Sequence, residues 1–185
     1  GKKITIDSAT MMNKVFEIIE AKKIFDINYN KLNILVHPKS YVHALIKFKN
    51  GLTKILIHDT DMTIPIFNSV YEKNKKAILT KKLNFSIINN LNFKKIDLKK
   101  FPVVKILEKL PNNHSLFETV IVAANDALVN MFLNKKIKFI DISKYLLKIS
   151  KKSEFAKYKR ILPKNVEDIV KLNKYVSLKI QSLSI

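Results

Sequence analysis

The most constraining feature of this sequence is an apolar run at residues 116–133 that repeats every three or four positions. Such spacing places the apolar side chains on one face of an α-helix. The residues that carry the pattern are Phe117, Val120, Ile121, Ala124, Leu128, Met131 and Phe132. They predict one long, largely buried helix, which needs other elements packed around it.

Shorter helical patterns lie on both sides of this run, at residues 103–110, 142–149 and 166–183. Several amphipathic helices joined by short connections are typical of a helical bundle. Asn125 and Asp126 place polar groups within the apolar run of the central helix. We interpret them as a buried hydrogen-bonded pair that joins the bundle to the preceding part of the chain.

The part of the chain before the bundle has a mixed pattern, with a buried strand predicted at residues 32–36 and a helix at residues 63–71. Periodicity then decays over residues 73–101, where short extended pieces fit at residues 84–88 and 92–98. The predicted fold class is α/β: part of an α/β domain with a mixed or antiparallel sheet, followed by a C-terminal α-helical bundle. The predicted domains are residues 1–75, a linker at residues 76–101 and the bundle at residues 102–185.

Asn50-Gly51 is a strong short-range signal for a β-hairpin, because both residue types tolerate a positive φ. The strands predicted around it are residues 41–49 and 52–58. A two-residue loop would place His43 opposite His58. Two histidines without a third ligand nearby do not predict a metal site. The predicted core face consists of Ala44, Ile46, Phe48, Thr53, Ile55 and Ile57.

The opening of the chain combines a strand predicted at residues 4–6 with a helix predicted at about residues 10–24. A strand that turns into a helix leaves free backbone N–H groups at the turn, where a phosphate can bind. Ser8 lies at this predicted turn. The opening therefore predicts a candidate anion site.

Three polar residues follow Ser8 on the predicted helix: Asn13, Lys14 and Glu17. Positions three and four residues apart share one flank of a helix. A hydroxyl, an amide, a cation and a carboxylate on one edge suit a phosphorylated, metal-chelated small molecule. Spacing alone, however, favours an ordinary exposed ion pair between Lys14 and Glu17, worth about 0.3–0.5 kcal/mol.

The net charge of +20 raises the alternative of a lysine-rich nucleic-acid-binding module. Arg160 is the only arginine among the 35 basic residues, and base and phosphate recognition favours the planar fork of arginine. The two glycines, Gly1 and Gly51, cannot form a G-x-G-x-x-G dinucleotide motif. The absence of cysteine excludes disulfides, cysteine-ligated zinc and a thiol nucleophile.

Several motifs follow one another along the chain: D-S-A-T-M-M-N-K at 7–14 with Glu17, I-E-A at 19–21, H-P-K-S at 37–40 with His43, D-M-x-x-P-I at 61–66 and A-A-N-D at 123–126. Together they resemble the 1-deoxy-D-xylulose 5-phosphate reductoisomerase family. The resemblance implies an NADPH- and metal-dependent oxidoreductase and isomerase of the non-mevalonate isoprenoid pathway. Its product is 2-C-methyl-D-erythritol 4-phosphate.

The resemblance also implies a role for each candidate residue. Ser8, Asn13 and Lys14 would bind the phosphate end of the substrate. Glu17 would ligate Mg²⁺ or Mn²⁺ and contact the substrate. Gly1 would contact the nicotinamide cofactor. His43 would lie near the active site and support catalysis without binding the metal.

By the same resemblance, residues 1–75 are the C-terminal portion of the catalytic domain. The NADPH-binding portion and two further acidic metal ligands would precede Gly1, and the segment by itself would be inactive. We also expect a homodimer, no nucleic-acid or membrane partner, and a location in the bacterial cytoplasm or a plastid-type organelle such as an apicoplast. The alternatives left open are the nucleic-acid-binding module and a structural or dimerisation half with an inert site.

Overall fold

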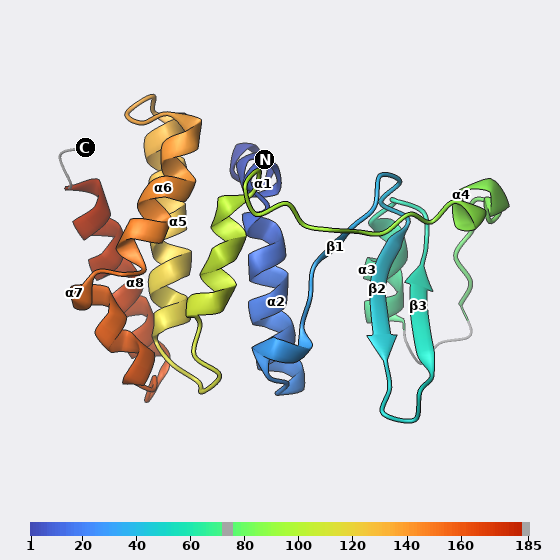
Figure 1. Cartoon of the computed structure of the whole chain (residues 1–185), viewed down its shortest axis with the longest axis horizontal. Helices are drawn as coiled ribbons and strands as arrows, with labels where there is room; N and C mark the ends of the chain where they lie inside the picture. Colours follow the sequence, from blue (N-terminus) through green and yellow to red (C-terminus); the bar gives the residue numbers. More distant parts are fainter. Residues whose placement is uncertain (72–75, 183–185) are drawn as a thin grey trace. The chain divides into compact units, whose positions relative to one another are not determined.

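The structure is a computed structural model that describes residues 1–71 and 76–182 (Figure 1). Its contacts divide the chain into two compact units, which we call the bundle unit (Gly1–Ile34 with Ile96–Ile185) and the hairpin unit (Leu35–Lys95). The predicted domain end at residue 75 and the predicted helix end at residue 183 lie outside the described residues. None of the helices in the described ranges has the length and apolar character needed to cross a membrane.

The bundle unit consists of helices joined by loops. Its elements are α1 (Lys2–Thr10), α2 (Met12–Phe25), the 3₁₀ helix η1 (Tyr29–Lys31), the 3₁₀ helix η2 (Pro102–Lys109), α5 (Phe117–Leu133), α6 (Phe139–Ile149), α7 (Ser153–Ala156), the 3₁₀ helix η3 (Lys157–Arg160) and α8 (Val166–Gln181). The helices predicted at residues 10–24, 116–133 and 142–149 are confirmed, and so is the described part of the one predicted at 166–183. The segment predicted at 103–110 is wound as a 3₁₀ helix, and the sequence analysis missed the helical turns at 153–160.

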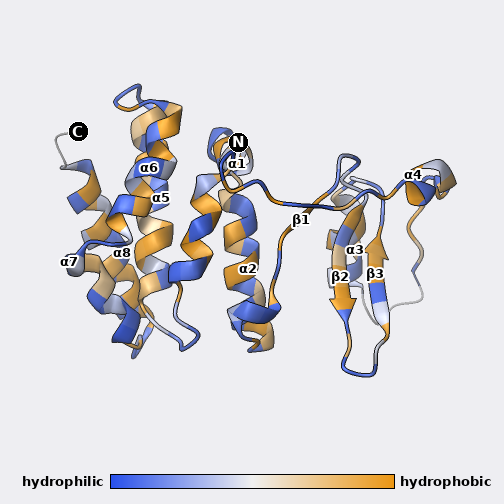
Figure 2. Cartoon of the chain, in the orientation of Figure 1, coloured by the Kyte–Doolittle hydropathy of each residue, from blue (hydrophilic) through white to orange (hydrophobic). Residues whose placement is uncertain are grey.

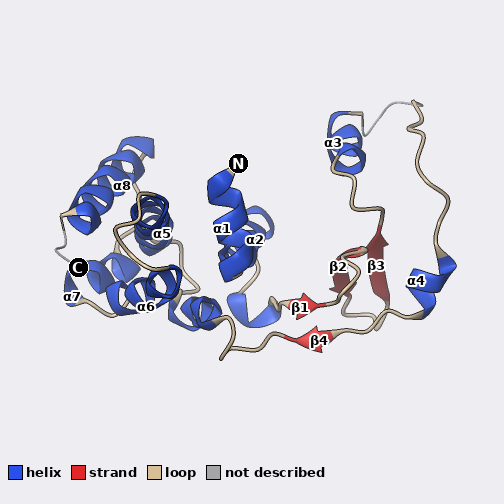
Figure 3. Ribbon diagram, turned by 90° about the horizontal axis from the view of Figure 1, so that it is seen from above, coloured by secondary structure: helices blue, strands red, loops and turns tan. Residues whose placement is uncertain are grey.

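Helix α5 forms the centre of the bundle unit and packs against α8, α6 and α1 (Figure 3). Eleven of its 17 residues are buried. Ala123, Ala124 and Ala127 are among them, and their small side chains let neighbouring helices approach closely. Phe117 and Leu128 have no exposed surface. The expectation of one long, largely buried helix is therefore confirmed.

The N-termini of two outer helices are capped by side chains. The Asn165 side chain accepts a hydrogen bond of 2.9 Å from the Asp168 N–H at the start of α8. The Asp141 carboxylate accepts one of 3.0 Å from the Lys138 N–H at the start of α6. Such bonds satisfy backbone donors that have no partner inside the helix. They fix where each helix begins.

The hairpin unit contains short strands and two short helices. Its elements are β1 (Leu35–Val36), β2 (Val42–Lys47), β3 (Thr53–Ile57), α3 (Thr63–Val70), α4 (Phe85–Asn89) and β4 (Lys94–Lys95). β2 pairs with β3 and β1 pairs with β4, both antiparallel. The predicted helix at residues 63–71 is confirmed. The buried strand predicted at 32–36 is reduced to two residues that are not buried, and the extended piece predicted at 84–88 is a helix.

The hairpin register differs by one residue from the prediction. Phe48 accepts a 3.1 Å hydrogen bond from the Gly51 N–H and donates one of 2.8 Å to Leu52, so the loop has three residues instead of two. Gly51 has a φ of 88°, which completes this loop and which glycine adopts without strain. Ile46 therefore pairs with Lys54 instead of Ile55. The predicted core face is wrong for the same reason, since a one-residue slip turns every side chain of one strand to the other face.

Burial separates the two units clearly. The apolar core cluster lies entirely in the bundle unit, whereas the strands of the hairpin carry exposed apolar residues, visible as orange segments in Figure 2. The fold class expected from the sequence, an antiparallel sheet accompanied by a helical bundle, is confirmed, with helix predominating. Because α1 and α2 pack with the bundle unit, the predicted domain boundaries remain a prediction about the longer protein.

Candidate phosphate and metal site

The candidate site lies at a junction between two helices. Residues 4–6 belong to α1, so the strand predicted there is wrong. β-branched residues disfavour a helix only weakly, and here a Lys3–Asp7 ion pair of 3.1 Å, four residues apart, supports the helix. The strand-to-helix turn proposed as a phosphate site therefore does not exist. Ser8 lies in the last turn of α1 and is exposed.

Met11 joins the two helices in a left-handed conformation, with φ 66° and ψ 16°. A residue with a side chain adopts this conformation only at a cost, so surrounding contacts must hold it. The Thr10 hydroxyl donates to the Ile6 carbonyl at 3.0 Å and accepts from the Met12 N–H at 3.4 Å. The Met11 N–H donates to the Ser8 carbonyl at 3.1 Å. These bonds end α1 and start α2 within one residue.

The predicted site residues on α2 lie near its beginning. Lys14 Nζ contacts both carboxylate oxygens of Glu17, at 2.9 and 3.0 Å, and both side chains are about half exposed. Asn13 is partly buried, and its Oδ1 has no hydrogen-bond partner among the described residues. An exposed ion pair is worth about 0.2–1 kcal/mol, so a phosphate and a cation can separate Lys14 from Glu17 at little cost.

A divalent cation would find one ligand in this site. Glu17 offers an exposed carboxylate, which suits Mg²⁺ or Mn²⁺. Across residues 1–71 and 76–182, no group of three or more histidine, cysteine, aspartate or glutamate residues is placed to hold a metal. The residues present therefore fit one part of a metal site, and the remaining oxygen ligands must come from substrate, water or residues outside this chain.

His43 belongs to the hairpin unit. A register shift between Val42 and Ala44 places it at a bulge in β2. Its ring stacks on that of His58, with centroids 3.5 Å apart, and its Nε2 lies 3.3 Å from the His58 carbonyl oxygen. The two histidines thus meet as expected, although the strand register is shifted.

A polar cluster ties α1 to α5. The Asn125 side-chain amide donates to the Asp7 carboxylate at 2.8 Å, and both residues are buried. Lys3 pairs with Asp7 at 3.1 Å and with Asp126 at 2.8 Å. Partial burial opposes the charge on Lys3, but the bonds to Asp126 and Asp7 outweigh it and raise the Lys3 pKa. Both residues join the bundle to the opening residues as expected, but only Asn125 is buried, because the Asp126 side chain is 38% exposed.

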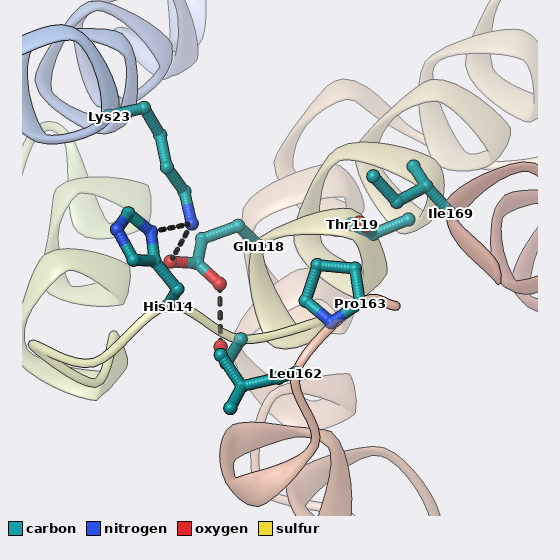
Figure 4. A pocket seen from close by; sticks show the side chains of 8 residues that line it. Lys23, His114, Glu118, Thr119, Leu162, Pro163 and Ile169 are labelled. Carbon is teal, nitrogen blue, oxygen red and sulfur yellow. Dashed lines mark hydrogen bonds and ion pairs between the residues drawn. The ribbon is translucent and has the colours of Figure 1, made fainter. Parts of the chain in front are cut away.

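A second cluster lines a cavity of about 480 Å³ in the bundle unit and was missed by the sequence analysis (Figure 4). Glu118 is buried, pairs with Lys23 at 3.3 Å and accepts a hydrogen bond of 2.6 Å from the Ser115 hydroxyl. Burial first, and then the Glu118 charge, raise the pKa of Tyr29, whose hydroxyl donates to Glu118 at 3.4 Å. His114 Nδ1 lies 3.1 Å from Lys23 Nζ. The polar groups satisfy one another, so this cluster fastens α2 to α5.

Comparison with known proteins places the chain in a family of reductoisomerases. Residues 57–177 match the model of the DXP reductoisomerase C-terminal domain, and residues 1–25 match that of the 1-deoxy-D-xylulose 5-phosphate reductoisomerase C-terminal domain. The chain belongs to the 1-deoxy-D-xylulose 5-phosphate reductoisomerase family.

Curated relatives match the sequence over most or all of the chain. The reductoisomerase of Pelagibacter ubique is 63% identical over 185 residues, which cover 100% of this chain and 48% of the relative. That of Sulfurihydrogenibium sp. is 39% identical over 157 residues, covering 85% of this chain and 42% of the relative. The chain thus spans about half the length of the curated relatives it matches.

Solved structures share the fold. The Zymomonas mobilis reductoisomerase in complex with NADPH has a TM-score of 0.83 and 31% identity, covering 99% of this chain and 48% of that one. A DOX-P reductoisomerase in complex with NADPH, fosmidomycin and magnesium has a TM-score of 0.85 and 28% identity, covering 98% and 46%.

Proposed function

We propose that this chain is the substrate- and metal-binding half of an enzyme that converts 1-deoxy-D-xylulose 5-phosphate to 2-C-methyl-D-erythritol 4-phosphate. The complete enzyme would use NADPH and a divalent metal. The observation that carries the proposal is the 63% identity to a curated reductoisomerase along the whole chain. The pairing of Lys14 with Glu17 at the start of α2 supports it, because it places a phosphate-binding cation beside a metal-binding carboxylate.

In this proposal, Ser8, Asn13 and Lys14 bind the phosphate end of the substrate. Lys14 supplies a charged donor, and Ser8 an exposed hydroxyl one residue beyond the buried Asp7. The side-chain oxygen of Asn13 is buried without a partner among the described residues, and a bound ligand would offer it one. Together they would hold the reacting carbons in one orientation, which lowers the entropy cost of the reaction.

Glu17 would be one ligand of the metal. When bound, Mg²⁺ or Mn²⁺ polarises the carbonyl and hydroxyl oxygens of the substrate. Magnesium is favoured, because solved relatives are complexes with magnesium. The half-exposed Glu17 carboxylate can exchange its contact with Lys14 for the metal without moving a buried group.

Two further roles follow from the family resemblance. Gly1 would contact the nicotinamide. His43, at the bulge in β2, would support the active site without ligating the metal. We also propose that the complete enzyme is a homodimer of the bacterial cytoplasm, since the relatives named above are bacterial, and not of a plastid-type organelle.

A chimaera tests this proposal: the Pelagibacter ubique relative with its matching segment replaced by these 185 residues. We expect the purified chimaera to oxidise NADPH when 1-deoxy-D-xylulose 5-phosphate and a divalent metal are both supplied, and to elute as a dimer in light-scattering chromatography. The 185 residues alone are expected to show no turnover. A folded chimaera without metal-dependent turnover contradicts the proposal, and turnover by the segment alone contradicts the assignment of NADPH binding to the other half.

A further inference from the structure

We propose that Asn125, on α5, is a positioning residue. By holding Asp7 of α1, it fixes α1 against α2 and so sets the affinity for the phosphorylated substrate. This inference rests on the proposed function of Ser8, Asn13, Lys14 and Glu17. It goes beyond that function because it assigns the affinity of the site to a residue of the bundle.

The contact between Asn125 and Asp7 is long-range, buried and short. The two residues are 118 positions apart, are 0% and 4% exposed, and are joined by a 2.8 Å bond from the Asn125 amide. Lys3 on α1 compensates the charge by pairing with Asp7 and Asp126. Loss of the Asn125 donor would leave a buried carboxylate with fewer partners, which is costly in a low-dielectric interior.

The two helices of the junction are anchored differently. Helix α2 is held by buried apolar side chains, including Met12 and Val15, which are 0% exposed. The buried residues of α1 are polar: Asp7 and Thr10. Two polar contacts join α1 to α5: the buried hydrogen bond that Asp7 accepts from Asn125, and the ion pair of 2.8 Å between Lys3 and Asp126. Of the two, only the Asp7 contact is formed between two buried residues, and the partly buried Ile6 adds apolar packing against the core.

The left-handed conformation of Met11 makes the position of Ser8 depend on how α1 is anchored. Its conformation lies between the two helices and persists only if both are held in place. Ser8 follows Asp7 directly, whereas Lys14 and Glu17 belong to α2. Releasing Asp7 would let Ser8 move relative to Lys14 while the apolar contacts keep α2 and Glu17 in place. The effect should therefore appear in substrate affinity more than in turnover.

Asn125→Asp in the chimaera tests the inference, because a second carboxylate would then face Asp7. The charged groups around the two are Lys3 from α1 and Asp126 from α5. We expect KM for 1-deoxy-D-xylulose 5-phosphate to rise about tenfold at mildly alkaline pH, with kcat changed less than about twofold. KM should recover toward acidic pH, relative to the parent chimaera at the same pH, because one proton shared between the carboxylates restores a donor.

The swapped pair Asp7→Asn with Asn125→Asp restores one amide and one carboxylate, and is expected to restore KM. Val176→Ala on α8 serves as the control, since it removes a fully buried side chain in the same bundle. It should lower Tm without changing KM. Asn125→Ala replaces Asn125→Asp in the comparison if the charged variant does not fold.

The outcomes separate the two proposals. In an active chimaera, any of three results would overturn the positioning role alone. Asn125→Asp leaves KM unchanged, the swapped pair does not restore KM, or Val176→Ala raises KM as much as Asn125→Asp does. A parent chimaera that is folded but inactive overturns the proposed function, and the inference falls with it.

Discussion

The bundle unit and the hairpin unit of this chain reach a fold by different physical means. Apart from Tyr41, every buried apolar side chain among the described residues lies in the bundle unit. The hairpin unit leaves Leu52, Leu56 and Ile46 between 49% and 63% exposed. Burial therefore stabilises the first unit, whereas turn geometry and backbone hydrogen bonds hold the hairpin strands together.

The candidate site residues follow this division. Ser8, Asn13, Lys14 and Glu17 stand on helices that pack with the bundle core, whereas His43 stands on the exposed hairpin. Catalytic geometry needs rigid support, and in the proposed function the bundle would supply it through α5. Three comparisons between the two units and one measurement within the bundle unit test this view.

The largest difference is expected in catalysis. In the chimaera, Glu17→Gln should lower kcat/KM by about 100- to 1,000-fold, because it removes a charged metal ligand. His43→Gln should lower it by about tenfold, because His43 only supports the site. Steady-state kinetics with a metal titration measures both, and circular dichroism checks that each variant is folded. Equal losses would remove the distinction between the two units.

The free energy of unfolding should also respond differently to substitutions in the two units. Leu128→Ala in α5 should lower the free energy of unfolding of the chain by about 2–5 kcal/mol, because it leaves a cavity in the core. Leu52→Ala removes a side chain that is 63% exposed and should change it by less than about 0.5 kcal/mol. Urea unfolding of the 185-residue chain measures both. A large effect of Leu52→Ala would show that the hairpin has a buried partner.

A backbone substitution probes the hairpin turn directly. Gly51→Ala should destabilise the hairpin by about 1 kcal/mol, because alanine is strained at a φ of 88° even though space for a Cβ is open. Hydrogen exchange should report faster exchange of the amides in β2 and β3, with those of α5 unchanged. Faster exchange in α5 as well would mean that the two units unfold together.

The smallest effect concerns alkaline pH. The folded state raises the pKa of Tyr29 above its ordinary value of about 10, first by burial and then through Glu118. The folded protein then binds the phenolic proton more tightly than the unfolded chain does. The contribution of Tyr29 to the free energy of unfolding is therefore present below pH 10 and is lost as the pH rises above it. Tyr29→Phe should therefore show a smaller alkaline loss of stability than the parent. Identical pH profiles would contradict this.

The sequence predicted what local patterns encode. The apolar spacing in residues 116–133 defines α5 because a buried helix must repeat at its own period. The sequence predicts a strand at residues 4–6 because β-branched residues favour strands. The local pattern contains no information about the ion pair or the contact with α5 that support α1. The hairpin was found, but its register was not, because a third loop residue shifts the pairing without changing the turn signal.

Long-range polar contacts were the least accessible from sequence. Asn125 stood out as an amide in an apolar run, which correctly predicted a buried hydrogen bond. No pattern in the sequence connects it with its partner Asp7, which lies 118 positions away. Glu118 and Lys23 were missed because each looks like an ordinary surface charge until the fold brings them to 3.3 Å.

The most direct test of the central claim compares two lysines in the chimaera. Lys14→Gln and Lys144→Gln each remove one charge from a chain of net charge +20, so both lower the net charge by the same amount. KM for 1-deoxy-D-xylulose 5-phosphate should rise about 10- to 100-fold for Lys14→Gln, which loses a charged hydrogen bond to phosphate, and stay near the parent value for Lys144→Gln. Equal KM values for the two variants would contradict a phosphate site at the α1–α2 junction.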